Sequence, residues 1–373
     1  MHRLKVTSLG SARSGLSLVS IGVALWAAGC GSSSSNGAGV PPGAGAPPGG
    51  GDAGAAEAGP PGDCLSGDIT PCSSFTTPTG TKVALGPYGA QMDENVGKGF
   101  ENAIQMGDML PANASTCQGF ANLFGEDPKL TAKLLQTTQN GVTIDFSLYS
   151  VYRPAAWKAG ETYPVITWGN GTCAQPEGYG ALLRYVASYG FVVVAANSRW
   201  VGSGSPQPML HALDYAAAAN ADPKSPYYQK LDLTNVGAMG HSQGGQATAT
   251  AASDPRIKDV IIFNAVDSGV AKPYLTTSGD MDITMFTAAS MASAIDASTV
   301  PAAYLYYLNP AGVGPLRGHL VLMLSPDRVT GPTLAWWQMT LKSDASSKSW
   351  FEGDSCMLCN MSTEFNFGEH GLN

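Results

Sequence analysis

The sequence predicts an α/β fold in which a mostly parallel central sheet is flanked by helices. Continuous apolar runs rich in β-branched residues are typical of strands buried on both faces of a sheet. Segments with helical spacing lie between these runs, and turns rich in Gly, Asn and Asp end them. Because strands alternate with helices, the strands are expected to be parallel. The 373 residues, 44% of them hydrophobic, suffice for one large domain or two small ones.

The expected elements follow an irregular, turn-rich segment at 64–140. The run at 302–308 suits a strand or a helix, and we expect a strand. Helices are expected at 179–189, where Gly190 is placed as the C-cap, at 209–219, directly after Ser242, and at 333–341. The expected strands lie at 141–154, 165–168, 191–196, directly before Ser242, 260–263, 274–278 and 302–308.

The N-terminal segment has the pattern of an export signal. A basic stretch at 3–13 precedes an apolar region at 16–28 that is too short to span a membrane as a helix. The tetrapeptide AAGC that ends at Cys30 resembles a bacterial lipobox. It predicts a lipoprotein-type signal peptide at 1–29 and a lipidated Cys30. The protein would then be anchored in the cell envelope, at the outer membrane. Ala27 stands where the lipobox usually has Leu, so secretion is the alternative.

Residues 30–63 are rich in Gly, Pro, Ala and Ser and predict a flexible linker. Such a segment buries too little apolar surface to offset the entropy of ordering it. The folded domain is expected at 64–373, with 64–140 as its N-terminal extension. A formal net charge of −8 excludes the basic surface of a nucleic-acid-binding protein. We also expect a monomer that contacts a membrane only through a lipid on Cys30.

The chain has seven cysteines. If Cys30 carries lipid, six remain, and an even number in an exported protein indicates disulfides. Short loops favour Cys64–Cys72 and Cys356–Cys359, which leaves Cys117–Cys173, although six cysteines allow 15 connectivities. The CxxC pair at 356–359 has no second such pair or pair of histidines near it, so we expect no metal site.

The segment 240–244, GHSQG, is the chain's only G-x-S-x-G match. A strand-like run precedes it and small helix-tolerant residues follow it, as a nucleophile elbow requires. Ser242 would lie on a sharp turn that exposes its hydroxyl. Glycine at 240 and 244 would then be a steric demand, because a side chain there would collide with the backbone.

A serine hydroxyl needs a base to take its proton, and four histidines follow the signal segment. His241 lies inside the elbow with its side chain directed away from Ser242, and we read it as a packing or site-wall residue. His211 is expected on the surface of a helix, and His370 in a frayed end. His319 follows the last expected strand, and it alone fits both the position and the order Ser, acid, His.

The acid should lie between Ser242 and His319, after a strand that follows the elbow. Asp280 and Asp282 follow the strand expected at 274–278, and Asp267 follows the preceding one. Periodicity does not choose between Asp280 and Asp282.

Two backbone amides should form an oxyanion hole. One would come from Gln243, and the other from the glycine-rich loop at 169–172.

With these parts assembled, the chain resembles exported α/β-hydrolases of the cutinase, poly(ethylene terephthalate) hydrolase and chlorophyllase-like group. The resemblance implies that Asp282 is the acid, that His319 is the base and that Asn170 and Gln243 supply the oxyanion amides. It covers about 141–341, through the segments PVITWGNGT at 164–172, GFVVVAANS at 190–198, GAMGHSQGG at 237–245, SGDMD at 278–282 and GHL at 318–320.

Gly171, His241 and Val266 are expected to line the substrate cleft. The chain departs from this group at Asn170, Val266 and Gln243. Polyester-degrading members usually have an aromatic residue at the position of Asn170 and a Trp where Val266 stands. Gln243 replaces the Met that is common among cutinases. These differences bear on polyester cleavage and leave ester hydrolysis itself untouched.

We therefore expect an exported serine hydrolase that cleaves carboxylic esters through an acyl-enzyme, without cofactor or metal. Its substrate would be a small-molecule or polymeric ester. One alternative keeps the fold and changes the reaction to acyl transfer or to hydrolysis of an amide or thioester. Another is a non-catalytic envelope lipoprotein that uses the fold for binding.

Overall fold

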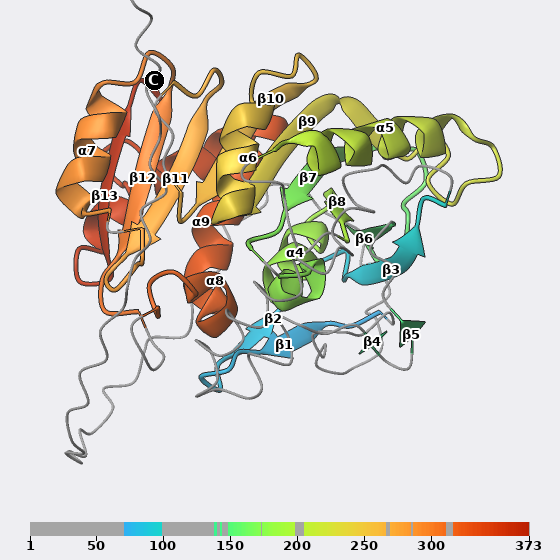
Figure 1. The fold of residues 1–373 in the computed structure, drawn as a ribbon, viewed down its shortest axis with the longest axis horizontal. Helices are drawn as coiled ribbons and strands as arrows, with labels where there is room; N and C mark the ends of the chain where they lie inside the picture. The colour runs from blue at the N-terminus through green and yellow to red at the C-terminus, as the bar shows by residue number, and fades with distance from the viewer. Residues whose placement is uncertain are drawn as a thin grey trace, which may run out of the picture. The chain divides into compact units, whose positions relative to one another are not determined.

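A central sheet of nine strands organises the computed structural model (Figure 1). In spatial order the strands are β13 (Phe365–His370), β12 (Ala302–Tyr307), β11 (Tyr274–Gly279), β10 (Ile257–Phe263), β9 (Leu231–His241), β7 (Tyr163–Gly169), β8 (Val192–Ala196), β6 (Tyr149–Arg153) and β3 (Gln91–Val96). From β12 to β8 all neighbours pair in parallel. The other pairs, β13 with β12, β6 with β8 and β3 with β6, are antiparallel. The predicted α/β fold with a mostly parallel sheet is confirmed.

The structure describes the chain in several ranges, all within the compact unit that spans 42–373. These ranges are 71–98, 138–139, 142–143, 148–172, 174–197, 205–265, 269–284, 286–310 and 316–372.

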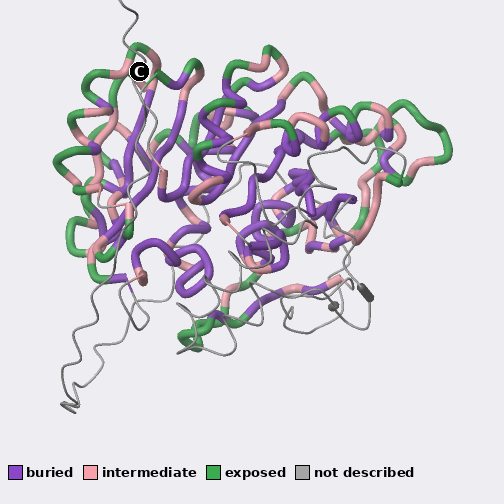
Figure 2. The backbone as a smooth tube through the Cα atoms, in the orientation of Figure 1, coloured by how far each residue is buried: buried purple, intermediate pink, exposed green. Residues whose placement is uncertain are grey.

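Helices cover both faces of the sheet, because its central strands are apolar on both sides. Every residue of β7 and β8 is buried. Alternate residues of β7 point to opposite faces, so Ile166 and Trp168 belong to one core cluster and Val165 to the other. Figure 2 shows the central strands as buried. The first cluster packs under α4 (Gly180–Ala187), α8 (Val321–Leu324) and α9 (Pro326–Leu341), and the second under α5 (Gln207–Ala221), α6 (Gln243–Ala251) and α7 (Ala288–Asp296).

Shorter elements complete the described chain. Strands β1 and β2 pair antiparallel, as do β4 and β5. The bounds are β1 (Ser74–Thr76), β2 (Lys82–Ala84), β4 (Thr138–Gln139), β5 (Val142–Thr143), η1 (Pro176–Tyr179), η2 (Ala345–Trp350) and η3 (Leu358–Asn360).

The sequence missed the antiparallel strands β3 and β13 at the two edges of the sheet. The sequence of β3 is QMDENV and that of β13 is FNFGEH, and neither has the continuous apolar run that marks the central strands. His370 pairs with Ala302 inside β13, so the expectation that this end is frayed was wrong. The run at 302–307 is a strand, as expected, and α9 begins at Pro326, seven residues before the predicted start.

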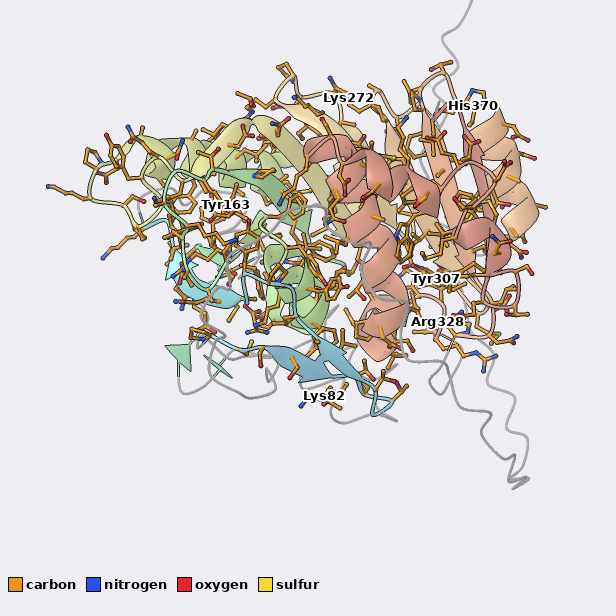
Figure 3. The ribbon with its side chains drawn as sticks, turned by 180° about the vertical axis from the view of Figure 1, so that it is seen from behind. Lys82, Tyr163, Lys272, Tyr307, Arg328 and His370 are labelled. Atoms are coloured by element: carbon orange, nitrogen blue, oxygen red, sulfur yellow. A yellow bond between two sulfur atoms is a disulfide. The ribbon has the colours of Figure 1, made fainter. Side chains whose placement is uncertain are left out.

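Arg328, in the first turn of α9, links the ends of β12 and β13. Its guanidinium donates to the carbonyl of Leu308 at 3.1 Å and to that of Glu364 at 2.7 Å. It also lies 5.7 Å from the ring centre of Tyr307 and 5.3 Å from that of Phe365. Figure 3 shows Arg328 beside Tyr307. The Arg328 side chain therefore connects the start of β13 to the end of β12.

Among the predicted disulfides, the pair Cys356–Cys359 is present. Cys72 is also disulfide-bonded, and its partner lies outside the described residues. The predictions for 1–29, 30–63, Cys30, Cys64, Cys117 and Cys173 fall outside the described residues as well. In the described part of the chain, no helix has the length and apolar character needed to cross a bilayer.

Candidate active site

Ser242 occupies the sharp turn between β9 and α6, at the carboxyl edge of the parallel strands. Its backbone has φ 55° and ψ −116°, a conformation that costs a non-glycine residue about 1–3 kcal/mol. The Ser242 amide donates to the carbonyl of Phe263 at 2.8 Å, which fixes the turn against β10. The strain is thus held by the sheet, as a nucleophile elbow requires.

The two glycines of the elbow are required by close backbone packing. A Cβ on Gly240 would collide with the carbonyl of Gly244. A Cβ on Gly244 would collide with the carbonyl of Gly169, at the end of β7. The first turn of α6 therefore lies directly against the loop that follows β7.

The structure brings Ser242, His319 and Asp282 into one hydrogen-bonded line. His319 Nε2 lies 2.9 Å from Ser242 Oγ, and His319 Nδ1 lies 2.8 Å from Asp282 Oδ1. The imidazole and the carboxylate are buried, with relative exposures of 5% and 7%. An ionised carboxylate only accepts, so the proton of neutral His319 is on Nδ1. Nε2 is then the acceptor that faces the serine hydroxyl.

In addition to the bond with His319, each carboxylate oxygen of Asp282 accepts a hydrogen bond from at least one other donor. Oδ2 accepts from Asn264 Nδ2 at 2.6 Å and from Ser278 Oγ at 2.9 Å, and Oδ1 accepts from the amide of Thr284 at 2.9 Å. Burial alone would raise the pKa of Asp282, but the bond and charge of His319 and these donors hold it below its usual range. Asp282 therefore stays ionised in a buried position.

Asn264 was not singled out from the sequence. It has a positive φ of 55°, and its amide nitrogen also donates to the carbonyl of Gly318 at 3.0 Å. It therefore joins the acid to the backbone directly before His319. An Asn at the end of a strand tolerates a left-handed conformation, and that is the one sequence signal that could have found it.

Asp280, the other candidate acid, lies outside the line. Its Oδ2 accepts from the amide of Asn309 at 2.8 Å, and its own amide donates to the carbonyl of Tyr307. It thereby connects the loop that carries Asp282 to the start of the loop that carries His319. Asp267 is outside the described residues.

Gln243 is the first residue of α6, and the N–H groups of a first helical turn have no partner within the helix. Its side-chain Oε1 accepts from Thr172 Oγ1 at 2.9 Å, which ties α6 to the loop after β7. The side chain of Asn170 is turned into the protein, where it accepts from Trp168 Nε1 at 2.7 Å and donates to the carbonyl of Ala196 at 2.8 Å. Only the backbone of Asn170 is therefore suited to an oxyanion.

Two of the three residues expected to line the cleft are buried, and the third is outside the described residues. Gly171 and His241 are buried, and both contact the hydroxyl of Tyr179, a residue that the sequence had not singled out. A side chain in the strand before the elbow faces the core, and this explains the position of His241. Val266 is outside the described residues, and His211 is half-buried on α5.

Among the described residues, no group of three or more His, Cys, Asp or Glu side chains could hold a metal ion.

Residues 138–301 match the family described as PETase, PET hydrolase-like. The match includes Ser242 and Asp282 and ends before His319. No curated protein matches the chain.

Proposed function

We propose that the chain is a serine ester hydrolase with Ser242, His319 and Asp282 as its triad. The match of residues 138–301 to the PET hydrolase-like family supports hydrolysis of ester substrates in the α/β-hydrolase fold. The observation that carries the proposal is the hydrogen-bonded line from Asp282 through His319 to a serine on a strained turn. The roles below follow from the protons and acceptors along that line.

Acylation begins when Ser242 Oγ attacks the carbonyl carbon of the ester and its proton passes to His319 Nε2. The imidazolium that forms is stabilised by ionised Asp282. The carbonyl oxygen becomes an oxyanion, for which the amides of Gln243 and Asn170 are the proposed donors. When the tetrahedral intermediate collapses, the bond to the alcohol oxygen breaks. His319 gives its proton to that oxygen, and the acyl group remains on Ser242.

Deacylation repeats these steps with water in place of the serine. Water attacks the acyl carbon while His319 Nε2 accepts one of its protons. The second tetrahedral intermediate then releases the carboxylic acid and returns the proton to Ser242 Oγ. The residues named supply a nucleophile, a proton shuttle and oxyanion donors, and the proposed cycle consumes one ester and one water and returns the enzyme to its starting state.

Hydrolysis of short p-nitrophenyl esters tests this function. Wild type should turn over with a burst of p-nitrophenol, and Ser242→Ala should lose at least about 10³-fold in kcat. A fluorophosphonate probe should label wild type at Ser242 and leave Ser242→Ala unlabelled. Folded protein that neither hydrolyses esters nor takes the label would favour the non-catalytic alternative. Full activity of Ser242→Ala would overturn the assignment.

The same preparation separates the alternatives that share the fold. Matched ester, thioester and anilide substrates compare the leaving groups, and added alcohols reveal acyl transfer. Ester hydrolysis should exceed anilide hydrolysis, and water should remain the main acyl acceptor. A larger yield of transfer product than of acid would replace hydrolase by acyltransferase.

We further propose that the protein is exported and carries lipid on Cys30, on the strength of the signal-like segment and the AAGC tetrapeptide. Cys30→Ala should move the protein from the membrane fraction to the soluble fraction. An unchanged distribution, with no mass shift at Cys30, would favour ordinary secretion.

A further inference from the structure

A second hydrogen-bonded line runs beside the proposed triad. The amide of Gly171 lies 3.1 Å from Tyr179 Oη, which lies 2.9 Å from His241 Nδ1. His241 Nε2 lies 2.7 Å from the carbonyl oxygen of His319. Tyr179 and His241 are 1% and 3% exposed, so water competes little for these bonds. The line joins the loop after β7 to the backbone of the proposed base.

Every proton in this line can be assigned from its ends. A carbonyl oxygen only accepts, so His241 Nε2 carries a proton and donates to His319. An amide only donates, so Gly171 gives its proton to Tyr179 Oη. Neutral His241 has an acceptor at Nδ1, to which the Tyr179 hydroxyl donates. Every hydrogen-bond donor in this line therefore faces an acceptor.

His241 must remain neutral in this arrangement. Its ring lies 4.8 Å from the ring of His319, which becomes cationic during the proposed reaction. Burial and the neighbouring His319 lower the pKa of His241 to about 3, while the backbone bond to His319 and the charge of Asp282 oppose this. A proton on Nδ1 would also leave the Tyr179 hydroxyl facing two donors, those of Gly171 and His241.

We propose that Tyr179 and His241 are positioning residues. They hold the loop after β7, the elbow and the backbone of His319 at fixed positions relative to one another. This inference rests on the proposed function, because these relative positions matter only if His319 and the oxyanion loop act together on the ester bound at Ser242. Both side chains are buried and bonded within this line, so their proposed role does not require contact with the ester. Their role is to fix the distance between the base and the oxyanion donors.

The same line assigns the amides of the oxyanion loop. The Gly171 amide is used by Tyr179, so it is not directed to the ester. Loss of the Tyr179 hydroxyl would release that amide and loosen the loop in which Asn170 stands. A merely structural loss would lower stability, whereas this loss lowers turnover at unchanged affinity for the substrate.

The tautomer of His241 is the first test, and it needs neither a variant nor activity. In wild type labelled with ¹⁵N-histidine, NMR should show His241 protonated at Nε2 and neutral from about pH 5 to 8. A proton on Nδ1 would overturn the proposal. If wild type shows the expected tautomer and lacks esterase activity, the proposed function fails while the assignment of protons stands.

Variants at position 241 then separate the two bonds of the imidazole. In His241→Gln the amide nitrogen lies near the place of Nε2 and keeps the donor to His319, but Tyr179 loses its acceptor. In His241→Asn the amide oxygen lies near Nδ1 and keeps the acceptor for Tyr179, but the donor to His319 is lost. Each variant, and Tyr179→Phe, should lower kcat about 10- to 100-fold with KM changed less than about threefold.

A double variant and a matched tyrosine complete the design. Tyr179→Phe with His241→Gln should lose no more kcat than Tyr179→Phe alone, because Tyr179→Phe already breaks the bond that His241→Gln removes. Tyr185→Phe, which removes the hydroxyl of a buried tyrosine in α4, should keep kcat within about twofold. Wild-type kcat in folded Tyr179→Phe or His241→Asn, or additive losses in the double variant, would overturn the proposal.

Discussion

Asp282 and Glu177 are buried carboxyl groups beyond the carboxyl ends of the parallel strands, and their surroundings are opposite. Asp282 accepts four hydrogen bonds. Glu177 Oε1 lies 3.2 Å from Ser150 Oγ, and its Oε2 has no hydrogen-bond partner. The single proton of Ser150 also has a closer acceptor, Asn197 Oδ1 at 2.8 Å. Glu177 is therefore short of donors where Asp282 is fully supplied.

The comparison shows that hydrogen-bond donors, and not burial alone, decide the direction in which the pKa of an interior carboxyl shifts. Burial raises the pKa of Glu177, and its bonds and the charge of Arg184 do not offset this. A protonated Glu177 can donate to Ser150, which then donates to Asn197, so the protons match the acceptors. Glu94 repeats the pattern: burial, together with the repulsion between the two carboxylates when Glu177 is ionised, raises the pKa of Glu94 to about 7.

The largest expected effect comes from making the same change at both carboxyls. Asp282→Asn keeps the shape but removes the charge that orients and stabilises the His319 imidazolium, so kcat should fall about 10⁴-fold. Glu177→Gln changes a carboxyl outside the proposed triad whose pKa is raised by burial, so kcat should stay within about threefold. Initial rates with p-nitrophenyl esters measure both. Similar losses in the two variants would erase the distinction.

Removal of one hydrogen-bond donor should make the surroundings of Asp282 more like those of Glu177. Asn264→Ala deletes the bonds to Asp282 and to the carbonyl of Gly318, so kcat should fall about 10-fold and the pKa of Asp282 should rise. Ser278→Ala, which deletes one donor to the same oxygen, should have a smaller effect. Rates across pH and circular dichroism measure these changes, and wild-type rates in Asn264→Ala would contradict the argument.

Stability should depend on pH with opposite signs at the two places. The pKa values of Glu177 and Glu94 are raised on folding, so the folded state holds extra protons and the free energy of unfolding falls as pH rises from about 4.5 to about 7. The pKa of Asp282 is lowered, so its contribution is present above about pH 4 and is lost in acid.

Thermal unfolding tests these signs. Relative to wild type, Glu177→Gln and Glu94→Gln should gain a few degrees in Tm between about pH 5 and pH 8, and Asp282→Asn should not. A Tm difference that stays constant with pH would show that the glutamates titrate at their ordinary values.

A small loss of kcat is expected at Asp280, which is two residues from Asp282 but outside the proposed triad. Asp280→Asn weakens its bond to the amide of Asn309 and loosens the loop before His319. The value of kcat should fall about two- to fivefold. A loss as large as that of Asp282→Asn, seen in the same rate assay, would reverse the choice between the two aspartates.

Short-range patterns in the sequence predicted the centre of the fold and the order of the proposed triad. Continuous apolar runs marked strands such as β8, and the spacing of glycines around Ser242 marked the elbow. The choice of Asp282 over Asp280 came from the family resemblance, because both suit a turn after a strand.

The parts that the sequence missed depend on contacts between distant segments. Tyr179 looks like any helix-end aromatic residue until the fold places it between Gly171 and His241. Asn264 becomes significant only when the loops of Asp282 and His319 meet beside it. Most residues of the edge strands β3 and β13 are half-buried or exposed, so neither strand has the continuous apolar run that marks the central strands.

The pairing of β13 with β12 has a practical consequence for handling the protein. It covers the last parallel strand along its full length, from Ala302 to Tyr307, and Arg328 fastens the start of β13 to the sheet. Truncation after residue 364 would uncover a row of unpaired backbone donors and acceptors on an apolar strand. Such an edge recruits strands from other molecules. A chain truncated after residue 364 should therefore aggregate although it still contains all three residues of the proposed triad.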